Sequence, residues 1–98
     1  MTDKVTKDQI AQWKQDFEAV FKIVVEDKTC YLHSPNRKAL SAASVIGAQN
    51  PMAFNEYILD KCWLAGDEEI KTKDSYFLAA SGQLAEILNF KEATLEKL

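Results

Sequence analysis

The chain contains two prolines, and each follows a residue that favours the start of a helix. Ser34 precedes Pro35, and Asn50 precedes Pro51. Serine and asparagine side chains accept hydrogen bonds from the free N–H groups of a first helical turn, and proline suits the first helical position because its missing N–H is not needed there. We therefore expect one helix over residues 35–46, stopped by Gly47, and another that runs from residue 51 and ends over residues 63–66.

The segment before residue 20 has the apolar spacing of an amphipathic helix. Thr6 and Gln9 have the capping-box spacing, in which each side chain satisfies a backbone donor of the first turn. Apolar residues then recur at intervals of three and four, at Ile10, Trp13, Phe17 and Val20. We expect this helix to end near Glu18 or Ala19.

Residues 21–25 and 29–33 are rich in β-branched and aromatic side chains. The polar residues 26–28 separate the two runs, which is typical of a β-hairpin. An isolated hairpin is marginal in water, so one face of this hairpin must pack on helices or pair with another strand.

The C-terminal part predicts a further helix after an acidic loop over residues 67–69. Thr72 or Asp74 caps this helix, Gly82 is a weak point within it, and residues 90–98 either extend it or fray. Its expected buried stripe is Tyr76, Phe77, Leu78, Ala80, Leu84, Ile87 and Leu88. The predicted order is α-β-β-α-α-α in one domain over residues 1–98, with residues 1–5 disordered: a small, mainly helical α+β domain with one β-hairpin.

Charge and cysteine content exclude several classes of function. The net charge is −3 and Arg37 is the single arginine, so we expect no nucleic-acid partner, since phosphate-binding surfaces concentrate basic residues. Cys30 and Cys62 lie in apolar surroundings and are expected to be buried thiols in a reducing compartment. The sequence shows neither the apolar core of a signal peptide nor a run of about 20 apolar residues, so we expect a cytoplasmic protein without a membrane partner.

The residue types needed for catalysis are scarce. The single histidine, His33, stands beside Ser34, but neighbouring side chains of a strand point to opposite faces and do not form a catalytic pair. One histidine and two distant cysteines match no zinc spacing, and the three glycines are too far apart for a phosphate loop. We expect a binding protein with no catalytic residue, no cofactor and no metal site.

Three segments resemble the tail assembly chaperones of long-tailed bacteriophages and prophages. Residues 31–40 (YLHSPNRKAL) are similar to that family's entry into a helix, an apolar residue followed by the pattern x-x-Pro-x-Arg-x-x-Leu. Residues 50–56 (NPMAFNE) open the next helix, which runs to residues 62–70 (CWLAGDEEI). A helix led by Asp74 follows, with Phe77-Leu78 and Gln83-Leu84, so the resemblance covers about three quarters of the chain.

This resemblance implies a chaperone in the host bacterial cytoplasm that binds the tape measure protein or a tail-tube protein. Whether the chain also forms a homo-oligomer is left open by the sequence. Such a role requires apolar grooves between helices or a strand edge, and an acidic rim would attract a basic partner. Tyr57 and Trp63 are candidate anchors, because tyrosine and tryptophan dominate binding hot spots. The expected partner-binding residues are Leu40, Ala43, Phe54, Tyr57, Ile58, Trp63, Asp67, Glu68 and Glu69.

Two other classes of binding protein remain open. A small virion structural protein or adaptor would use the edge of the hairpin to pair with neighbouring subunits. A cytoplasmic regulatory protein would instead need a basic surface around Arg37, Lys38 and Lys61. An enzyme is the weakest alternative, since His33 is its only candidate residue.

Overall fold

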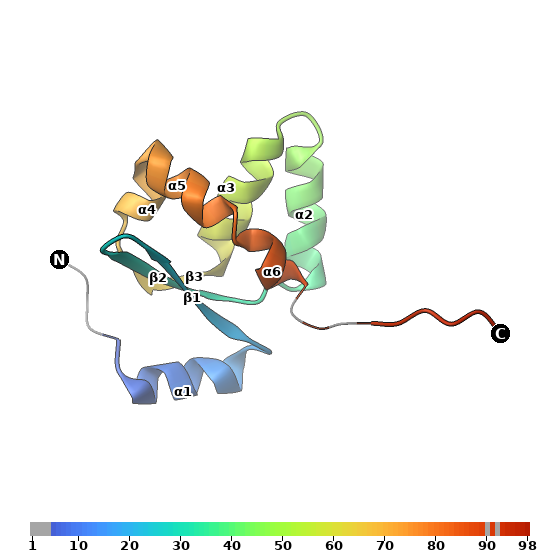
Figure 1. The fold of residues 1–98 in the computed structure, drawn as a ribbon, viewed down its shortest axis with the longest axis horizontal. Helices are drawn as coiled ribbons and strands as arrows, with labels where there is room; N and C mark the ends of the chain where they lie inside the picture. Colours follow the sequence, from blue (N-terminus) through green and yellow to red (C-terminus); the bar gives the residue numbers. More distant parts are fainter. Residues whose placement is uncertain (1–4, 90, 92) are drawn as a thin grey trace.

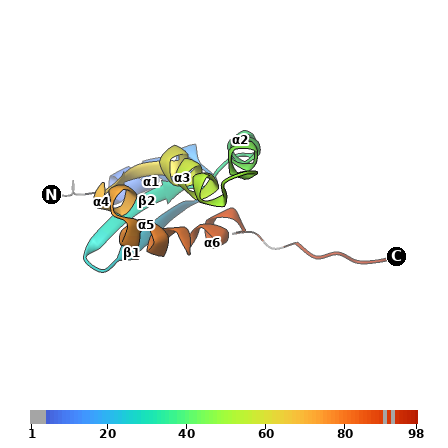
Figure 2. The same ribbon diagram turned by 90° about the horizontal axis from the view of Figure 1, so that it is seen from above.

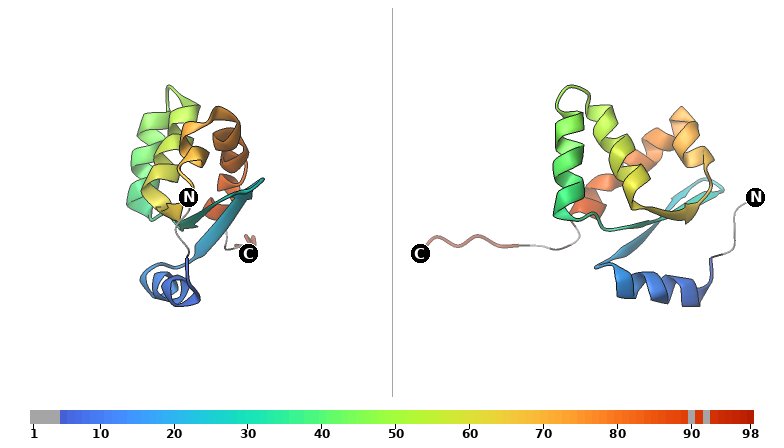
Figure 3. Two further views of the ribbon diagram at one scale, coloured as in Figure 1. Left: turned by 90° about the vertical axis from the view of Figure 1, so that its left-hand side faces the viewer. Right: turned by 180° about the vertical axis from the view of Figure 1, so that it is seen from behind.

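A computed structural model describes residues 5–89, 91 and 93–98 of the chain. A three-stranded antiparallel sheet separates two helical layers (Figure 1): α1 lies on one face, and α2 to α6 lie on the other. Seen from the side, the first helix lies well apart from the larger helical layer (Figure 3). The structure thus confirms the predicted mainly helical α+β domain. The predicted disorder of residues 1–5 falls mostly on residues 1–4, outside the described residues.

The predicted hairpin is formed by β1 (Val20–Val25) and β2 (Lys28–His33). Val25 pairs with Lys28, so the connection is the two-residue turn Glu26-Asp27, one residue shorter than expected. Glu26 has a φ of 55°, in the left-handed region that tight hairpin turns require.

The sheet has a third strand, β3 (Trp63–Gly66), where the sequence predicted only the end of a helix. It pairs antiparallel with β2, with Gly66 beside Cys30 and an irregularity between Tyr31 and Leu32. Gly66 has a φ of 146°, and a Cβ placed there would lie 2.5 Å from the Cys30 Cα. Only glycine fits this backbone conformation and this close approach.

The first helix, α1 (Lys7–Asp16), begins at the predicted cap. The Thr6 hydroxyl accepts a hydrogen bond from the Gln9 N–H at 3.1 Å. The helix ends at Asp16, earlier than predicted, and Val20 of the expected apolar stripe belongs to β1 instead. No residue of α1 is fully buried.

The next helix, α2 (Arg37–Gly47), starts later than predicted because its cap is Asn36, whose side chain accepts a hydrogen bond from the Ala39 N–H at 2.8 Å. The predicted cap, Ser34, extends the sheet instead. Its N–H donates to the Ala19 carbonyl at 2.9 Å, and its buried hydroxyl accepts from the Ala19 N–H at 3.3 Å. Ser34 has a sheet partner, so it cannot also cap a helix.

The third helix, α3 (Pro51–Cys62), has the predicted start and lies beside α2 (Figure 1). Pro51 takes the first helical position, while Asn50 makes no side-chain cap. A Cβ on Gly47 would lie 2.7 Å from the Phe54 Cβ, so this glycine lets the two helices approach.

The predicted C-terminal helix is divided into α5 (Asp74–Ser81) and α6 (Leu84–Leu88). A one-turn helix that the sequence did not predict, α4 (Glu69–Thr72), precedes it. The break between α5 and α6 falls at Gly82, the predicted weak point. Residues 91 and 93–98 are not helical, whereas residues 90 and 92 of the expected extension lie outside the described residues. Within the described ranges, no helix is long and apolar enough to cross a membrane.

The core lies between the sheet and the larger helical layer. The expected stripe of the C-terminal helices contributes Phe77, Ala80, Leu84 and Ile87 to it, but Leu78 is 53% exposed. The largest fully buried side chains are Cys30, Leu32, Ile58, Leu59, Cys62 and Ile70.

Candidate protein-binding surface

Two adjoining hollows of about 420 and 360 Å³ form a groove between α3 and α5. They share Glu56, Lys71 and Phe77, so they are continuous, and we call them together the α3–α5 groove. Its apolar lining comes from Ile46, Met52, Ala53, Tyr57, Leu59, Phe77 and Leu78. Its charged lining comes from Glu56, Asp60, Lys71 and Asp74.

Three large apolar side chains of the groove are exposed. Leu78 is 53% exposed, Ile46 43% and Met52 41%, and each comes from a different helix. Single exposed apolar residues are ordinary, but a group of them around a hollow is typical of a surface that contacts a partner. The groove therefore offers apolar area that the fold itself does not cover.

The charge of the groove is acidic. Glu56, Asp60 and Asp74 carry three negative charges, and Lys71 is the single cation in its lining. The Lys71 ammonium lies 3.4 Å from a carboxylate oxygen of Asp60 and 4.3 Å from the centre of the Trp63 ring. This cation is thus held by the protein's own groups, and the uncompensated charge of the groove is negative.

Tyr57, Trp63 and Glu68 are predicted partner-binding residues that lie in or beside the groove. Tyr57 lines it directly, and the Lys61 ammonium lies 5.6 Å from the centre of its ring. Trp63, in β3, is half-buried against the core, and the Lys71 ammonium lies over its ring in a cation–π contact. Glu68 is exposed and lies 3.9 Å from the Lys71 ammonium.

Two predicted partner-binding residues form no part of the surface. Ala43 and Ile58 are both 0% exposed, because the contacts of α2 and α3 with the rest of the fold cover them. Leu40 and Phe54 are half-buried and pack against the core, and Phe54 lines a separate hollow between α2 and α3. Ala43 of α2 and Ile58 of α3 therefore offer no surface to a partner in this fold.

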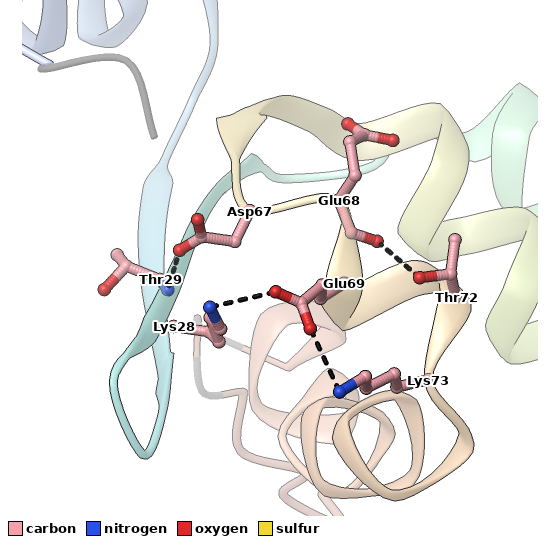
Figure 4. Close-up of polar contacts among 7 residues, drawn as sticks. All are labelled: Lys28, Thr29, Asp67, Glu68, Glu69, Thr72 and Lys73. Atoms are coloured by element: carbon pink, nitrogen blue, oxygen red, sulfur yellow. Dashed lines mark hydrogen bonds and ion pairs between the residues drawn. The ribbon is translucent and has the colours of Figure 1, made fainter. Parts of the chain in front are cut away.

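The acidic residues 67–69 mostly hold the fold together rather than form a free rim (Figure 4). An Asp67 carboxylate oxygen accepts a hydrogen bond from the Thr29 N–H at 2.9 Å. Glu69 lies 2.9 Å from the Lys28 ammonium and 3.2 Å from that of Lys73. Hydrogen bonds from these two lysines lower the pKa of Glu69 below its usual value, and the same contact raises the pKa of Lys28. The loop therefore fastens the hairpin to α4.

His33 and the two thiols occupy structural positions. The His33 ring stacks on Phe17 with 3.9 Å between ring centres, and its Nδ1 lies 2.8 Å from the Ser34 carbonyl oxygen. Cys30 and Cys62 are free and buried, and burial raises the pKa of each thiol to about 11. A neutral buried thiol is a poor nucleophile. Among the described residues, no three His, Cys, Asp or Glu side chains are placed to hold a metal ion.

Asp74 and Leu78 line the groove although the sequence did not predict a binding surface there. Ile46, Met52, Glu56 and Asp60 also line it; they belong to helices expected to bind a partner but were not named individually. One signal was present: Glu56 and Asp60 are four residues apart on α3 and thus share one face of that helix. No protein-family model, no curated protein and no solved structure matches this chain.

Proposed function

We propose that the chain is a non-catalytic assembly chaperone of the phage tail type, which binds an amphipathic helical segment of the tape measure protein in the α3–α5 groove. The groove itself is the observation that carries the proposal. It presents three exposed apolar side chains, Ile46, Met52 and Leu78, among acidic residues. An amphipathic helix with basic residues flanking its apolar stripe has the complementary chemistry.

The geometry of the groove supports a helical occupant. Its walls are α3 and α5, and its lining reaches from Ile46 at the end of α2 to Asp60 near the end of α3. A helix laid between two helices places apolar side chains at every third or fourth position into the gap. Glu56 and Asp60 stand one turn apart, so they can contact basic residues one turn apart on the partner.

The sequence resemblance supplies the identity of the partner. The resembling segments are residues 31–40, 50–56, 62–70 and the helix led by Asp74. Two of them contribute to the groove: the start of α3 and the part of α5 that holds Asp74, Phe77 and Leu78. The client that the resemblance implies is a long, aggregation-prone protein, which must be kept soluble before tail-tube subunits are recruited. A small protein with an acidic, apolar groove and no catalytic centre suits that task.

The test measures binding of the full chain to a purified tape measure protein, taken from the same genome as this chain. Met52→Asp and Leu78→Asp place a charge in the apolar lining, and each is expected to weaken binding at least about ten-fold, because a methionine or leucine buried against a partner contributes roughly 1.5–3 kcal/mol. Val45→Asp is the matched control: Val45 is 78% exposed on α2 but lines neither hollow of the groove.

Equal binding by the two groove variants and by Val45→Asp would refute the groove as the binding surface. Failure of the unsubstituted chain to bind the tape measure protein would refute the chaperone role itself. Charge reversal offers a second arm: Glu56→Lys with Asp60→Lys should reduce binding and also its dependence on salt, since the acidic pair attracts a basic helix.

A virion structural protein or adaptor is the second candidate, favoured by one observation. β1 lies at the edge of the sheet, and among the described residues it pairs only with β2, which leaves an edge for a neighbouring subunit. Mass spectrometry of purified particles separates the two functions, because a chaperone is absent from the finished particle and an adaptor is present.

A further inference from the structure

The edge of the sheet at β1 carries a second surface, distinct from the α3–α5 groove. In a two-residue hairpin the residues that flank the turn, here Val25 and Lys28, form a hydrogen-bonded pair, and such pairs alternate along the strands. The bond from the Ser34 N–H to the Ala19 carbonyl fits this alternation. The backbone groups directed away from β2 are therefore those of Val20, Lys22 and Val24.

A groove lies directly beside this edge. A hollow of about 470 Å³ is lined by residues 21–25 of β1 together with Ala79 of α5, Glu86 and Ile87 of α6, and Gln83 between the two helices. Ile23 is only 5% exposed and points toward the core, so the inner side of the edge is apolar. Glu86 is the single acidic residue in the lining of this hollow.

Residues 93–98, which we call the C-terminal arm, extend away from the body of the protein (Figures 1 and 2). The arm has six residues without helical structure, the same length as β1. Leu95 is 99% exposed, and Leu98 is fully exposed. Two large apolar residues on a projecting extended segment favour a strand that finds its partner on another molecule.

We propose that the C-terminal arm of one copy pairs antiparallel with the β1 edge of a second copy. Glu96 lies opposite Lys22, which places Leu98 opposite Val20 and Thr94 opposite Val24 on the outer side of the sheet. On the inner side Leu95 then lies opposite Ile23, and Lys97 lies opposite Phe21, on the side of the strand where Glu86 lines the groove. Glu96 thus faces Lys22 directly, and Lys97 lies on the side of the strand whose hollow has Glu86 as its acidic residue.

Other registers lose this complementarity. A shift of two residues in one direction leaves Leu98 beyond β1, and a shift in the other sets Glu96 opposite Val24 and Leu98 opposite Lys22. A parallel arrangement can keep Glu96 beside Lys22, but it then sets Lys97 against the buried Ile23. An odd shift moves Leu95 from the inner to the outer face. Charge and burial together therefore select the antiparallel register.

A second copy is the occupant that the geometry selects. In the proposed register residue 93 lies beside Val25, at the hairpin end of β1. The arm follows α6, which ends at Leu88, and it projects away from that hairpin (Figure 1). The arm therefore pairs with the β1 edge of another copy rather than with its own. A second β1 strand fits the edge less well, because the register centred on Lys22 sets two lysines opposite each other. Arm-to-edge contacts join two different surfaces, so they produce either a reciprocal dimer or a head-to-tail chain.

Sedimentation of the full chain over a range of concentrations tests the inference. Lys22→Glu alone and Glu96→Lys alone should each weaken self-association about five-fold, since each sets like charges opposite one another. A mixture of the two variants should restore it in part, because the edge of the first variant complements the arm of the second. The double variant should regain the original association. Lys7→Glu, an exposed change on α1, is the matched control.

Leu95→Asp gives a larger effect and does not depend on the edge strand staying folded. Leu95 lies in a segment that projects from the body, so the variant keeps the fold, and its self-association should fall about ten-fold or more. A full chain that stays monomeric at every concentration overturns the inference. So does association that persists unchanged in Leu95→Asp, or a mixture of charge variants that associates no better than each variant alone. These changes lie outside the α3–α5 groove, so their outcome is independent of tape measure binding.

Discussion

The two faces of the sheet are covered in very different ways. On the inner face Cys30 and Leu32 are completely buried under α3 to α6. On the outer face α1 has no fully buried residue, and its ring contacts with the sheet are Trp13 with Tyr31 and Phe17 with His33. The alternation of side chains along β2 produces both faces from neighbouring residues of one strand.

This difference divides the molecule into parts of unequal stability. Burial of apolar area contributes about 25 cal/mol per Å², so the inner face provides most of the free energy of folding. A ten-residue helix is too short to be stable alone in water, where about 12–15 residues are needed, so α1 depends on its two aromatic contacts. We expect α1 to open locally while the rest of the domain stays folded.

Gly66→Ala should have the largest effect on the inner face. The new Cβ would lie 2.5 Å from both the Cys30 Cα and the Thr29 carbonyl oxygen, at a φ of 146° that other residues rarely adopt. Backbone strain costs about 1–3 kcal/mol, and the displacement of β3 from β2 adds to that, so a loss of roughly 4 kcal/mol or more is expected. Urea unfolding measures the loss; a variant as stable as the original chain would show that β3 does not join the sheet here.

Leu32→Ala measures the packing of the inner face directly. Leu32 is a large and fully buried residue of β2, and its truncation should lower the free energy of unfolding by about 2–5 kcal/mol. Val24→Ala is the matched change on the outer side of β1, where the side chain is exposed, and should cost less than about 0.5 kcal/mol. Similar losses in both variants would contradict the contrast between the two faces.

Local signals explain the parts of the fold that the sequence predicted well. The hairpin turn and the start of α3 at Pro51 depend on a few neighbouring residues, and both were located to within a residue or two. β3 was missed because four residues, Trp63–Gly66, form a strand only through pairing with β2, about 35 positions earlier. Ser34 was assigned as a helix cap for the same reason, since its partner Ala19 is distant in sequence.

The candidate site was harder to predict than the fold. Leu78 belongs to the stripe that was expected to be buried, yet it is 53% exposed and lines the groove. Asp67 and Glu69 were expected to be free acids, yet Asp67 accepts a hydrogen bond from Thr29 and Glu69 forms an ion pair with Lys28. Exposure and pairing depend on tertiary contacts, which residue spacing alone does not contain.

The two buried thiols provide a measure of how well water is excluded from the core. Burial raises the pKa of Cys30 and Cys62 from 9.0 to about 11, so the folded state holds these protons at a pH where the unfolded chain releases them. The contribution to stability is complete below pH 9 and is lost as the pH rises toward 11, about 1 kcal/mol per thiol by pH 10. The free energy of unfolding, measured between pH 8 and 10.5, should show this decline. In the variant with both cysteines changed to alanine, the decline should be smaller by the contribution of the two thiols. An unchanged slope in that variant would mean that water reaches the thiols.

Phe17→Ala should have the smallest effect on global stability and the most local one. The substitution removes the stack on His33, one of the two ring contacts between α1 and the sheet, so about 1 kcal/mol is expected. Because that contact stabilises α1 and little else, amide hydrogen exchange should accelerate across residues 7–16 and stay unchanged in β2 and α3. Trp13→Ala is the matched change at the other contact, with Tyr31, and should give the same pattern. Equal acceleration in α1 and α3 would show that both faces of the sheet unfold as one unit and would remove the distinction between them.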